Sequence, residues 1–192
     1  MTLGAQPAFY YDFTSPDAYL ASERVMSALG EVPEWIPVDL AGLAAGGVGA
    51  FRCAEEEAIF RDDVESRARS YQLQPLRWPD PFPADTRWAL LAATYAKQIG
   101  RAVAFSQAAF RQAFAGGRDL GVRDNVLLAA AACEMHPLAV IKGAELRSTR
   151  RRLEAATAAA AAAGVLDVPA VLAGGRVFHG DRELEVAAGA LQ

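Results

Sequence analysis

Short apolar runs bounded by turn residues occur at both ends of the chain, and apolar positions follow a helical period between them. Residues 7–13 form an aromatic-rich run that stops at Thr-Ser-Pro, which predicts a buried strand leading into a helix. Residues 34–38 predict a second strand, and Pro37 indicates a sheet edge or a strand end. Residues 168–173 and 176–179, separated by a Gly-Gly pair, predict a hairpin.

Helical periodicity dominates the rest of the sequence. The first helix is expected over residues 16–29, since Ser15 suits an N-cap, Pro16 suits the first helical position and Gly30 ends the apolar stripe. Further helical patterns cover residues 54–71, 85–100, 103–115, 123–135, 137–163 and 182–191. A glycine- and alanine-rich run over 41–49 predicts a flexible connector, and the alanine run 155–163 predicts a tightly packed helix.

The order of elements is strand-helix-strand, a helical block, then strand-strand-helix, which indicates an α/β fold. A strand-helix-strand unit of this length normally makes a right-handed parallel crossover. The chain has 192 residues, a length that suits one domain carrying an insertion. We therefore expect residues 1–40 and 164–192 to form one domain, with 41–163 as a helical insertion.

Composition narrows the classes of partner. A hydrophobic fraction of 53% excludes a disordered chain, and the net charge of −4 disfavours nucleic acid and anionic membranes as partners. The sequence shows neither a secretory leader pattern nor 18 consecutive uncharged apolar residues, so we expect a cytoplasmic protein that acts on small molecules or proteins. Cys53 and Cys133 are far apart and are expected as reduced, partly buried thiols, and no metal site is expected.

Three segments carry a resemblance to a known family. Residues 9–20, with the sequence FYYDFTSPDAYL, resemble the opening of 2-hydroxychromene-2-carboxylate isomerases and kappa-class glutathione transferases. Residues 164–170 and 175–182 are similar to the pre-proline strand, hairpin and terminal loop of that family. The likeness extends over nearly the whole chain. It implies a thioredoxin-like βαβ–ββα fold with a large helical insertion, as in the DsbA-like superfamily.

The resemblance assigns a catalytic role to Ser15, which stands where redox relatives carry a cysteine. Ala18 removes the second cysteine of the redox pair, so thiol–disulfide exchange within the chain is excluded. In the family the sulfur comes from glutathione, whose thiolate accepts a hydrogen bond from this serine. Glutathione, or another low-molecular-weight thiol, is thus the expected cofactor. From the local sequence alone, Ser15 is better explained as a helix N-cap, and only the resemblance over the whole chain favours the catalytic role.

The same resemblance implies further ligand-binding residues. Val168, before a cis Pro169, would pair with the cysteinyl backbone of the thiol, although an ordinary strand-start proline is the alternative. Asp181 and Arg182 would hold the γ-glutamyl end, with charged surface residues as the alternative; anchoring the alignment on Gly180 shifts the family's Asp-Arg pair one place later. Asp85 stands where relatives often have Asn.

Three functions follow from these features. The first is a glutathione-dependent cis–trans isomerase acting on an aromatic acid similar to 2-hydroxychromene-2-carboxylate. The second is a kappa-like glutathione transferase, and the third is a redox-silent, thiol-binding module of the same fold. A disulfide oxidoreductase is disfavoured, because neither cysteine lies at the first helix start. Relatives are often homodimers, and the sequence itself shows no interface signature.

Overall fold

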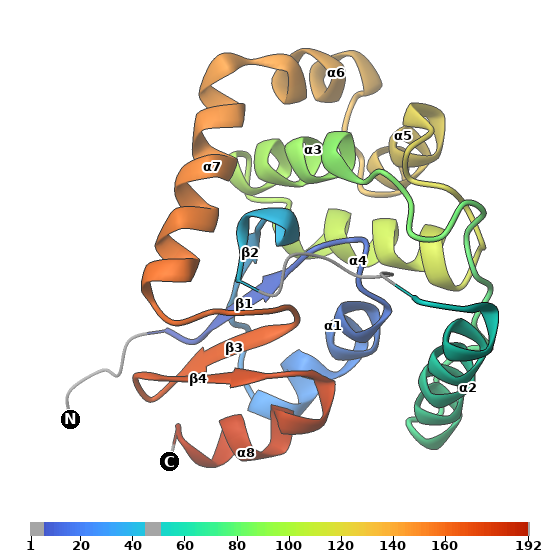
Figure 1. Cartoon of the computed structure of the whole chain (residues 1–192). Helices are drawn as coiled ribbons and strands as arrows, with labels where there is room; N and C mark the ends of the chain where they lie inside the picture. The colour runs from blue at the N-terminus through green and yellow to red at the C-terminus, as the bar shows by residue number, and fades with distance from the viewer. Residues whose placement is uncertain (1–5, 45–50, 192) are drawn as a thin grey trace.

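The computed structural model of the chain describes residues 6–44 and 51–191, in which four strands form one sheet flanked by helices (Figure 1). The strands are β1 (Ala8–Tyr11), β2 (Glu34–Pro37), β3 (Ala170–Ala173) and β4 (Arg176–His179). The helices are α1 (Pro16–Leu29), α2 (Ala54–Ser70), α3 (Arg87–Gln98), α4 (Ala102–Phe114), α5 (Arg123–Ala132), α6 (Pro137–Glu145), α7 (Arg147–Ala162) and α8 (Leu184–Gly189), with 3₁₀ turns η1 (Leu40–Gly42) and η2 (Asp181–Glu183).

The sheet has the strand order β2-β1-β3-β4. β1 and β2 are parallel and are joined through α1, whereas β3 pairs antiparallel with β1 and with β4. In this register Tyr10 lies between Ile36 and Ala170. The predicted α/β fold with its hairpin is confirmed, and β2, which contains Pro37, is an edge strand as predicted.

Alternate residues of β1 face opposite layers of the molecule. Phe9 and Tyr11 point into the main core with α1, α3 and α4, and they pack edge to face against Trp35 at ring-centroid distances of 4.9 and 5.7 Å. Tyr10 faces the other side, where Ala160 of α7 and Val165 cover part of the sheet. The strand period of the sequence thus sorts the two layers.

One predicted helix is wrong. Residues 137–163 form two helices rather than one, because Leu146 adopts an extended conformation with φ −62° and ψ 137°. Its carbonyl accepts the first hydrogen bond of α7, from the Arg150 N–H at 3.2 Å. Figure 1 shows α6 and α7 running in different directions on either side of this residue. The connector predicted over 41–49 begins with η1, and residues 45–49 lie outside the described residues.

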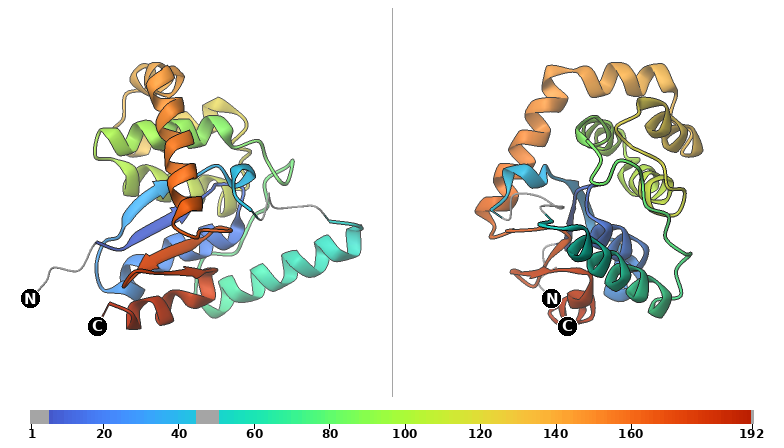
Figure 2. Two further views of the ribbon diagram at one scale, coloured as in Figure 1. Left: turned by 60° about the vertical axis from the view of Figure 1, so that its left-hand side comes forward. Right: turned by 45° about the vertical axis from the view of Figure 1, so that its right-hand side comes forward.

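Two helices, α2 and α8, lie beside α1. α8 packs against α1, and α2 lies beside α1 with its N-terminal end reaching away from the body (Figure 2). Only Val64 and Ala68 of α2 are buried. The half-buried Phe60 of α2 also packs on Trp78 and Phe82, so apolar contacts are confined to one side of this helix.

Replacing Gly143 by Ala is expected to destabilise the fold, because a Cβ there would lie 2.3 Å from Tyr95 Cδ2 on α3. Overpacking of this kind typically costs about 1–3 kcal/mol of unfolding free energy, measurable by urea denaturation. Gly189→Ala is the matched control, since its Cβ meets no atom within 4 Å. Equal stability of the two variants would contradict the predicted close packing of α6 on α3.

Candidate functional site at the start of helix α1

Ser15 is the N-cap of α1, as the sequence predicts. Its backbone is extended at φ −89° and ψ 114°, and its Oγ accepts a hydrogen bond from the Ala18 N–H at 3.1 Å. Pro16 follows at the first helical position, where a missing N–H costs nothing. Ser15 is only 1% exposed, so this hydroxyl is enclosed at the positive end of the helix.

The structure brings Val168 and Pro169 to Ser15 from the other end of the chain. The Ser15 hydroxyl donates to the Val168 carbonyl at 3.2 Å, and the peptide bond between Val168 and Pro169 is cis. The Val168 N–H donates to Asp167 Oδ1 at 2.7 Å. Three of the residues expected at the site therefore lie together, and the Ser15 hydroxyl both caps α1 and bonds the Val168 carbonyl just before β3.

The carboxylate of Asp12 fixes the loop that carries Ser15. It accepts hydrogen bonds from the Thr14 N–H at 2.9 Å, the Thr14 and Thr86 hydroxyls at 3.0 Å each, and the Leu40 N–H at 2.9 Å. Burial raises the pKa of Asp12 above its ordinary value, and these hydrogen bonds oppose that shift. Sequence reasoning gave Asp12 no role; the Asp-x-Thr spacing of an Asx turn was its only local signal.

Asp85 lies near this loop but not against Ser15. It is exposed, and its Oδ1 accepts a hydrogen bond from the Arg87 N–H at 3.1 Å. It lines a cavity of about 260 Å³ together with Asp12, Thr14 and Thr86. Asp85 and Thr14, the residue before Ser15, therefore line the same cavity.

Asp181 is buried and its carboxylate is already occupied. One oxygen pairs with Arg67 of α2, and the other accepts a hydrogen bond from the Tyr71 hydroxyl at 2.9 Å. The exposed Arg182 instead pairs with Asp63 at 3.0 Å. Asp181 and Arg182 are adjacent in sequence, yet the structure gives them different surroundings and places only Asp181 inside.

Arg67 joins α2 to the start of α1. It donates to Asp17 at 2.6 Å and to Asp63 at 3.0 Å, besides its pair with Asp181. Burial raises the pKa of Asp17, and the Arg67 charge opposes that shift. Since Asp17 lies in the first turn of α1, Arg67 offsets a negative charge beside Ser15. No sequence signal linked Arg67 to this site.

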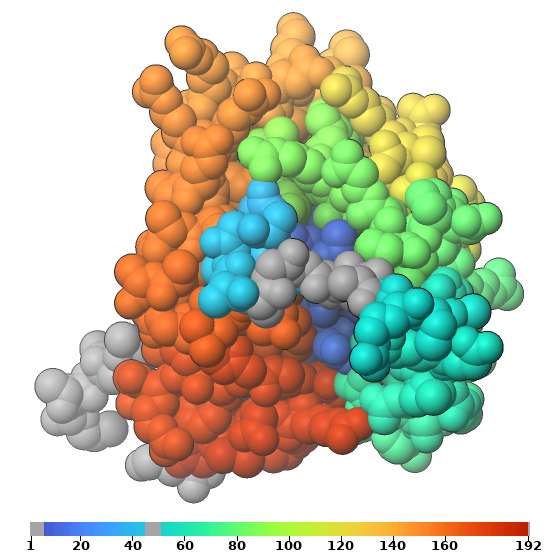
Figure 3. Space-filling model, viewed as in Figure 1, coloured from blue at the N-terminus to red at the C-terminus, as the bar shows by residue number. Residues whose placement is uncertain are grey.

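An aromatic cluster lies between α2 and the segment before α3. Trp78 packs edge to face on Phe82 at 4.9 Å, and its indole donates to Glu65 at 2.8 Å. Phe82 also lines a narrow cavity of about 10 Å³ with Phe13 and Thr14. In Figure 3 only a small area of dark-blue N-terminal atoms is visible beside the green and light-blue segments.

The two cysteines lie at the ends of other helices, Cys53 before α2 and Cys133 after α5. Cys133 is buried, as predicted, and burial raises the pKa of its thiol; Cys53 is exposed, contrary to prediction, because it precedes α2 at its outer end. In residues 6–44 and 51–191 no group of three potential metal-ligating side chains occurs. In the same ranges no helix has the length and apolar character needed to span a bilayer.

Asp12→Asn is expected to lower the unfolding free energy by about 1–3 kcal/mol, because the new amide group would face the Leu40 N–H, donor against donor. Asp85→Asn is the control, since an exposed Asn still accepts the bond from Arg87 and should change stability by less than about 0.5 kcal/mol. Urea denaturation measures both variants. Equal stabilities would show that the Asp12 carboxylate is not the anchor.

Arg67→Gln is expected to cost about 3 kcal/mol, because it leaves the buried Asp181 carboxylate without its cation. Arg69→Gln, on the exposed side of the same helix, should change stability by less than about 1 kcal/mol. Urea denaturation compares the two variants, and proteolysis of α2 reports its detachment. A loss no larger in Arg67→Gln than in Arg69→Gln would contradict the role given to Arg67.

Comparison with known proteins places these features in a family. The DSBA-like thioredoxin domain matches residues 8–192. A 2-hydroxychromene-2-carboxylate isomerase from Sphingobium xenophagum is 34% identical over 118 residues, which is 58% of this chain and 59% of that relative. The aligned stretch thus spans less than two thirds of that relative's length.

Solved structures agree on the fold. The structure of a 2-hydroxychromene-2-carboxylate isomerase aligns with a TM-score of 0.84 at 22% identity, covering 96% of this chain and 93% of that chain. A probable DsbA oxidoreductase from Streptomyces coelicolor aligns with a TM-score of 0.78 at 20% identity, covering 97% and 88%. With a family match that includes every described strand and helix, the chain belongs to the DSBA-like thioredoxin domain family.

Proposed function

We propose that this protein is a thiol-dependent cis–trans isomerase of an aromatic acid similar to 2-hydroxychromene-2-carboxylate. The observation that carries the proposal is the Ser15 hydroxyl at the start of α1, beside Val168, where redox relatives have a cysteine. The curated relative at 34% identity bears the name of that isomerase. Glutathione or another low-molecular-weight thiol is the proposed cofactor.

The residues around Ser15 fit a bound thiolate. When bound, the thiol supplies a nucleophile that adds to an unsaturated carbon, allows rotation about the former double bond and leaves again. Ser15 turns its proton from the Val168 carbonyl toward the sulfur, and the helix start adds a favourable field. Arg67 keeps the neighbouring Asp17 charge from opposing that anion.

Asp181 and Arg182 differ in how accessible they are to the far end of the thiol. Asp181 is buried and already bonded to Arg67 and Tyr71, so the ammonium group of a γ-glutamyl unit would reach its carboxylate only if these neighbours moved. Arg182 is exposed, and among the described residues its ion-pair partner is the exposed Asp63, so it can exchange that pair for an anionic group of the thiol. Asp85 and the aromatic cluster flank the loop of Ser15 on the side we propose for the substrate. A homodimer and a cytoplasmic location stay predictions of the sequence.

A redox-silent thiol-binding module is the second candidate. It is favoured by the enclosure of Ser15, whose hydroxyl already has both a donor and an acceptor as partners. Such a module would bind a thiol without changing a substrate. A kappa-like transferase differs in its product, since transfer leaves a stable thiol conjugate.

Ser15→Ala is expected to lower the thiol-dependent isomerisation rate about 100-fold, the usual loss when a hydrogen-bond donor to a developing or bound anion is removed. The rate is measured from the ultraviolet spectrum of the substrate, and product mass separates isomer from conjugate. Loss of the N-cap also costs about 1 kcal/mol of stability, which thermal unfolding quantifies separately.

Ser27→Ala is the matched control, because Ser27 lies on the exposed side of the same helix and its hydroxyl donates to the Arg24 carbonyl of that helix. It should keep the full rate. An unchanged rate in Ser15→Ala, or no thiol-dependent rate in the unmodified protein, would refute the isomerase. Thiol binding by calorimetry without turnover would then favour the binding module.

A further inference from the structure

A cavity of about 440 Å³ lies on the sheet face opposite α1, between β2, α3 and α7. Its walls include Tyr10 and Ile36 from the sheet and Arg152 and Ala156 from α7. Neither Ser15 nor Val168 contributes to it. The volume falls within the range of about 300–1,000 Å³ that small-molecule sites occupy.

The alanine run of α7 creates this space. Thr157 and Ala160 are buried and seat the helix on the fold, while Ala155, Ala156 and Ala159 line the cavity. Longer side chains at these three positions would narrow the space over Ile36, which is open to solvent because Ala155 and Ala159 are exposed. The result is an apolar wall on the helix facing an apolar floor on the edge strand.

Tyr10 brings a polar group to the cavity. The residue as a whole is 6% exposed, and its hydroxyl makes no hydrogen bond within residues 6–44 and 51–191 and stays open to solvent. Burial and the charge of Glu34 raise the pKa of Tyr10, so the phenol is a neutral donor at physiological pH. This donor is available to a ligand.

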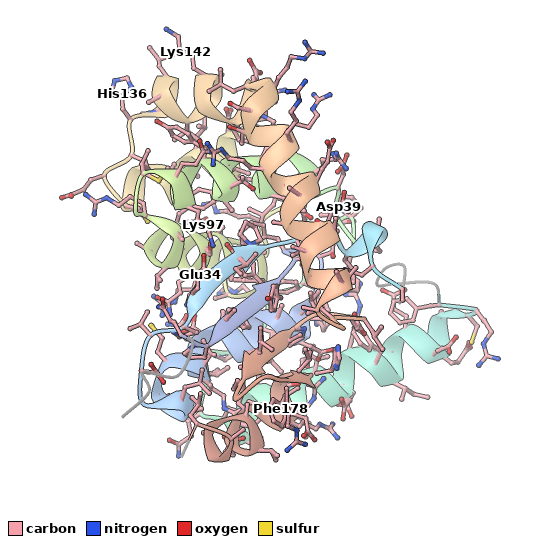
Figure 4. All side chains as sticks on the ribbon, turned by 90° about the vertical axis from the view of Figure 1, so that its left-hand side faces the viewer. Glu34, Asp39, Lys97, His136, Lys142 and Phe178 are labelled. Carbon is pink, nitrogen blue, oxygen red and sulfur yellow. The ribbon has the colours of Figure 1, made fainter. Side chains whose placement is uncertain are left out.

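Among the charged residues that line the cavity, Arg152 has no carboxylate partner in the described part of the chain. Glu34 is neutralised by Lys97 at 2.6 Å, and Lys97 also donates to the Trp35 carbonyl at 3.2 Å. Arg152 lines the same cavity and pairs with no carboxylate in the described part of the chain. Figure 4 shows Lys97 and Glu34 close together beside α7. The rim therefore carries one unpaired positive charge.

We propose that this cavity binds a small monocarboxylic acid with an apolar body. Its carboxylate would pair with Arg152 and accept a hydrogen bond from Tyr10, and its body would lie between Ile36 and the alanines of α7. The site is separate from the proposed isomerase site and does not depend on it. A straight-chain fatty acid and an aromatic acid share this chemistry.

Calorimetric titration with octanoate and with benzoate tests the proposal and distinguishes the two sources. We expect saturable binding of one acid, with 1-octanol, which lacks the charge, binding about tenfold more weakly than octanoate if the fatty acid is preferred. Arg152→Gln should weaken the preferred acid about tenfold, and Tyr10→Phe should weaken it severalfold. Ala156→Trp should abolish binding by filling the cavity.

Arg151→Gln is the matched control, because Arg151 is exposed on the same helix and does not line the cavity. It should bind like the unmodified protein, and thermal unfolding confirms that every variant is folded. Absence of saturable binding, or equal affinities of Arg152→Gln and Arg151→Gln, would overturn the proposal. So would a dimer that Ala156→Trp dissociates, since a second copy would then cover this face.

Discussion

The buried carboxylate of Asp12 is the constraint on which the fold and the site both depend. It stands directly after β1, and its hydrogen bonds draw in Leu40 of η1 and Thr86 before α3, two segments far from it in sequence. No cation contacts it among the hydrogen bonds of the described residues, so these donors replace water around the charge. The Ser15 N–H bonds the Asp12 carbonyl at 3.2 Å, so the N-cap of α1 is held by the same residue.

Ion pairs act together with apolar contacts to hold α2 against this centre. Asp17 in the first turn of α1 is favourable to the helix but unfavourable to an anion bound at its start. Arg67 resolves that conflict, since one guanidinium pairs with Asp17, Asp63 and Asp181. A planar group with several donors can serve three carboxylates at once, which a lysine could not do with the same geometry. The position of α2 and the charge balance at the start of α1 are therefore coupled through Arg67.

Local signals predicted most of the fold, and long-range contacts explain what they missed. The Ser15-Pro16 cap, the aromatic-rich strand β1 and the Gly-Gly hairpin are each determined within a few residues, and each is confirmed. The break at Leu146 has no Gly or Pro to mark it, so periodicity alone predicted one helix where there are two. Asp181 meets Arg67 across 114 positions and Tyr71 across 110, and no spacing in the sequence indicates such partners.

The alanine run of α7 was predicted to form a tightly packed helix, and this prediction is right for one side of the helix and wrong for the other. As predicted, Ala160 and Thr157 pack tightly; a Cβ on Gly42 would lie 2.9 Å from the Thr157 methyl group. On the cavity side the same small side chains leave space, because they are too short to reach Tyr10 and Ile36 on the sheet. A cavity remains where the neighbouring side chains are too short to fill the space between them. Sequence patterns record which side chains are present, so such a space becomes visible only when α7, α3 and β2 are placed together.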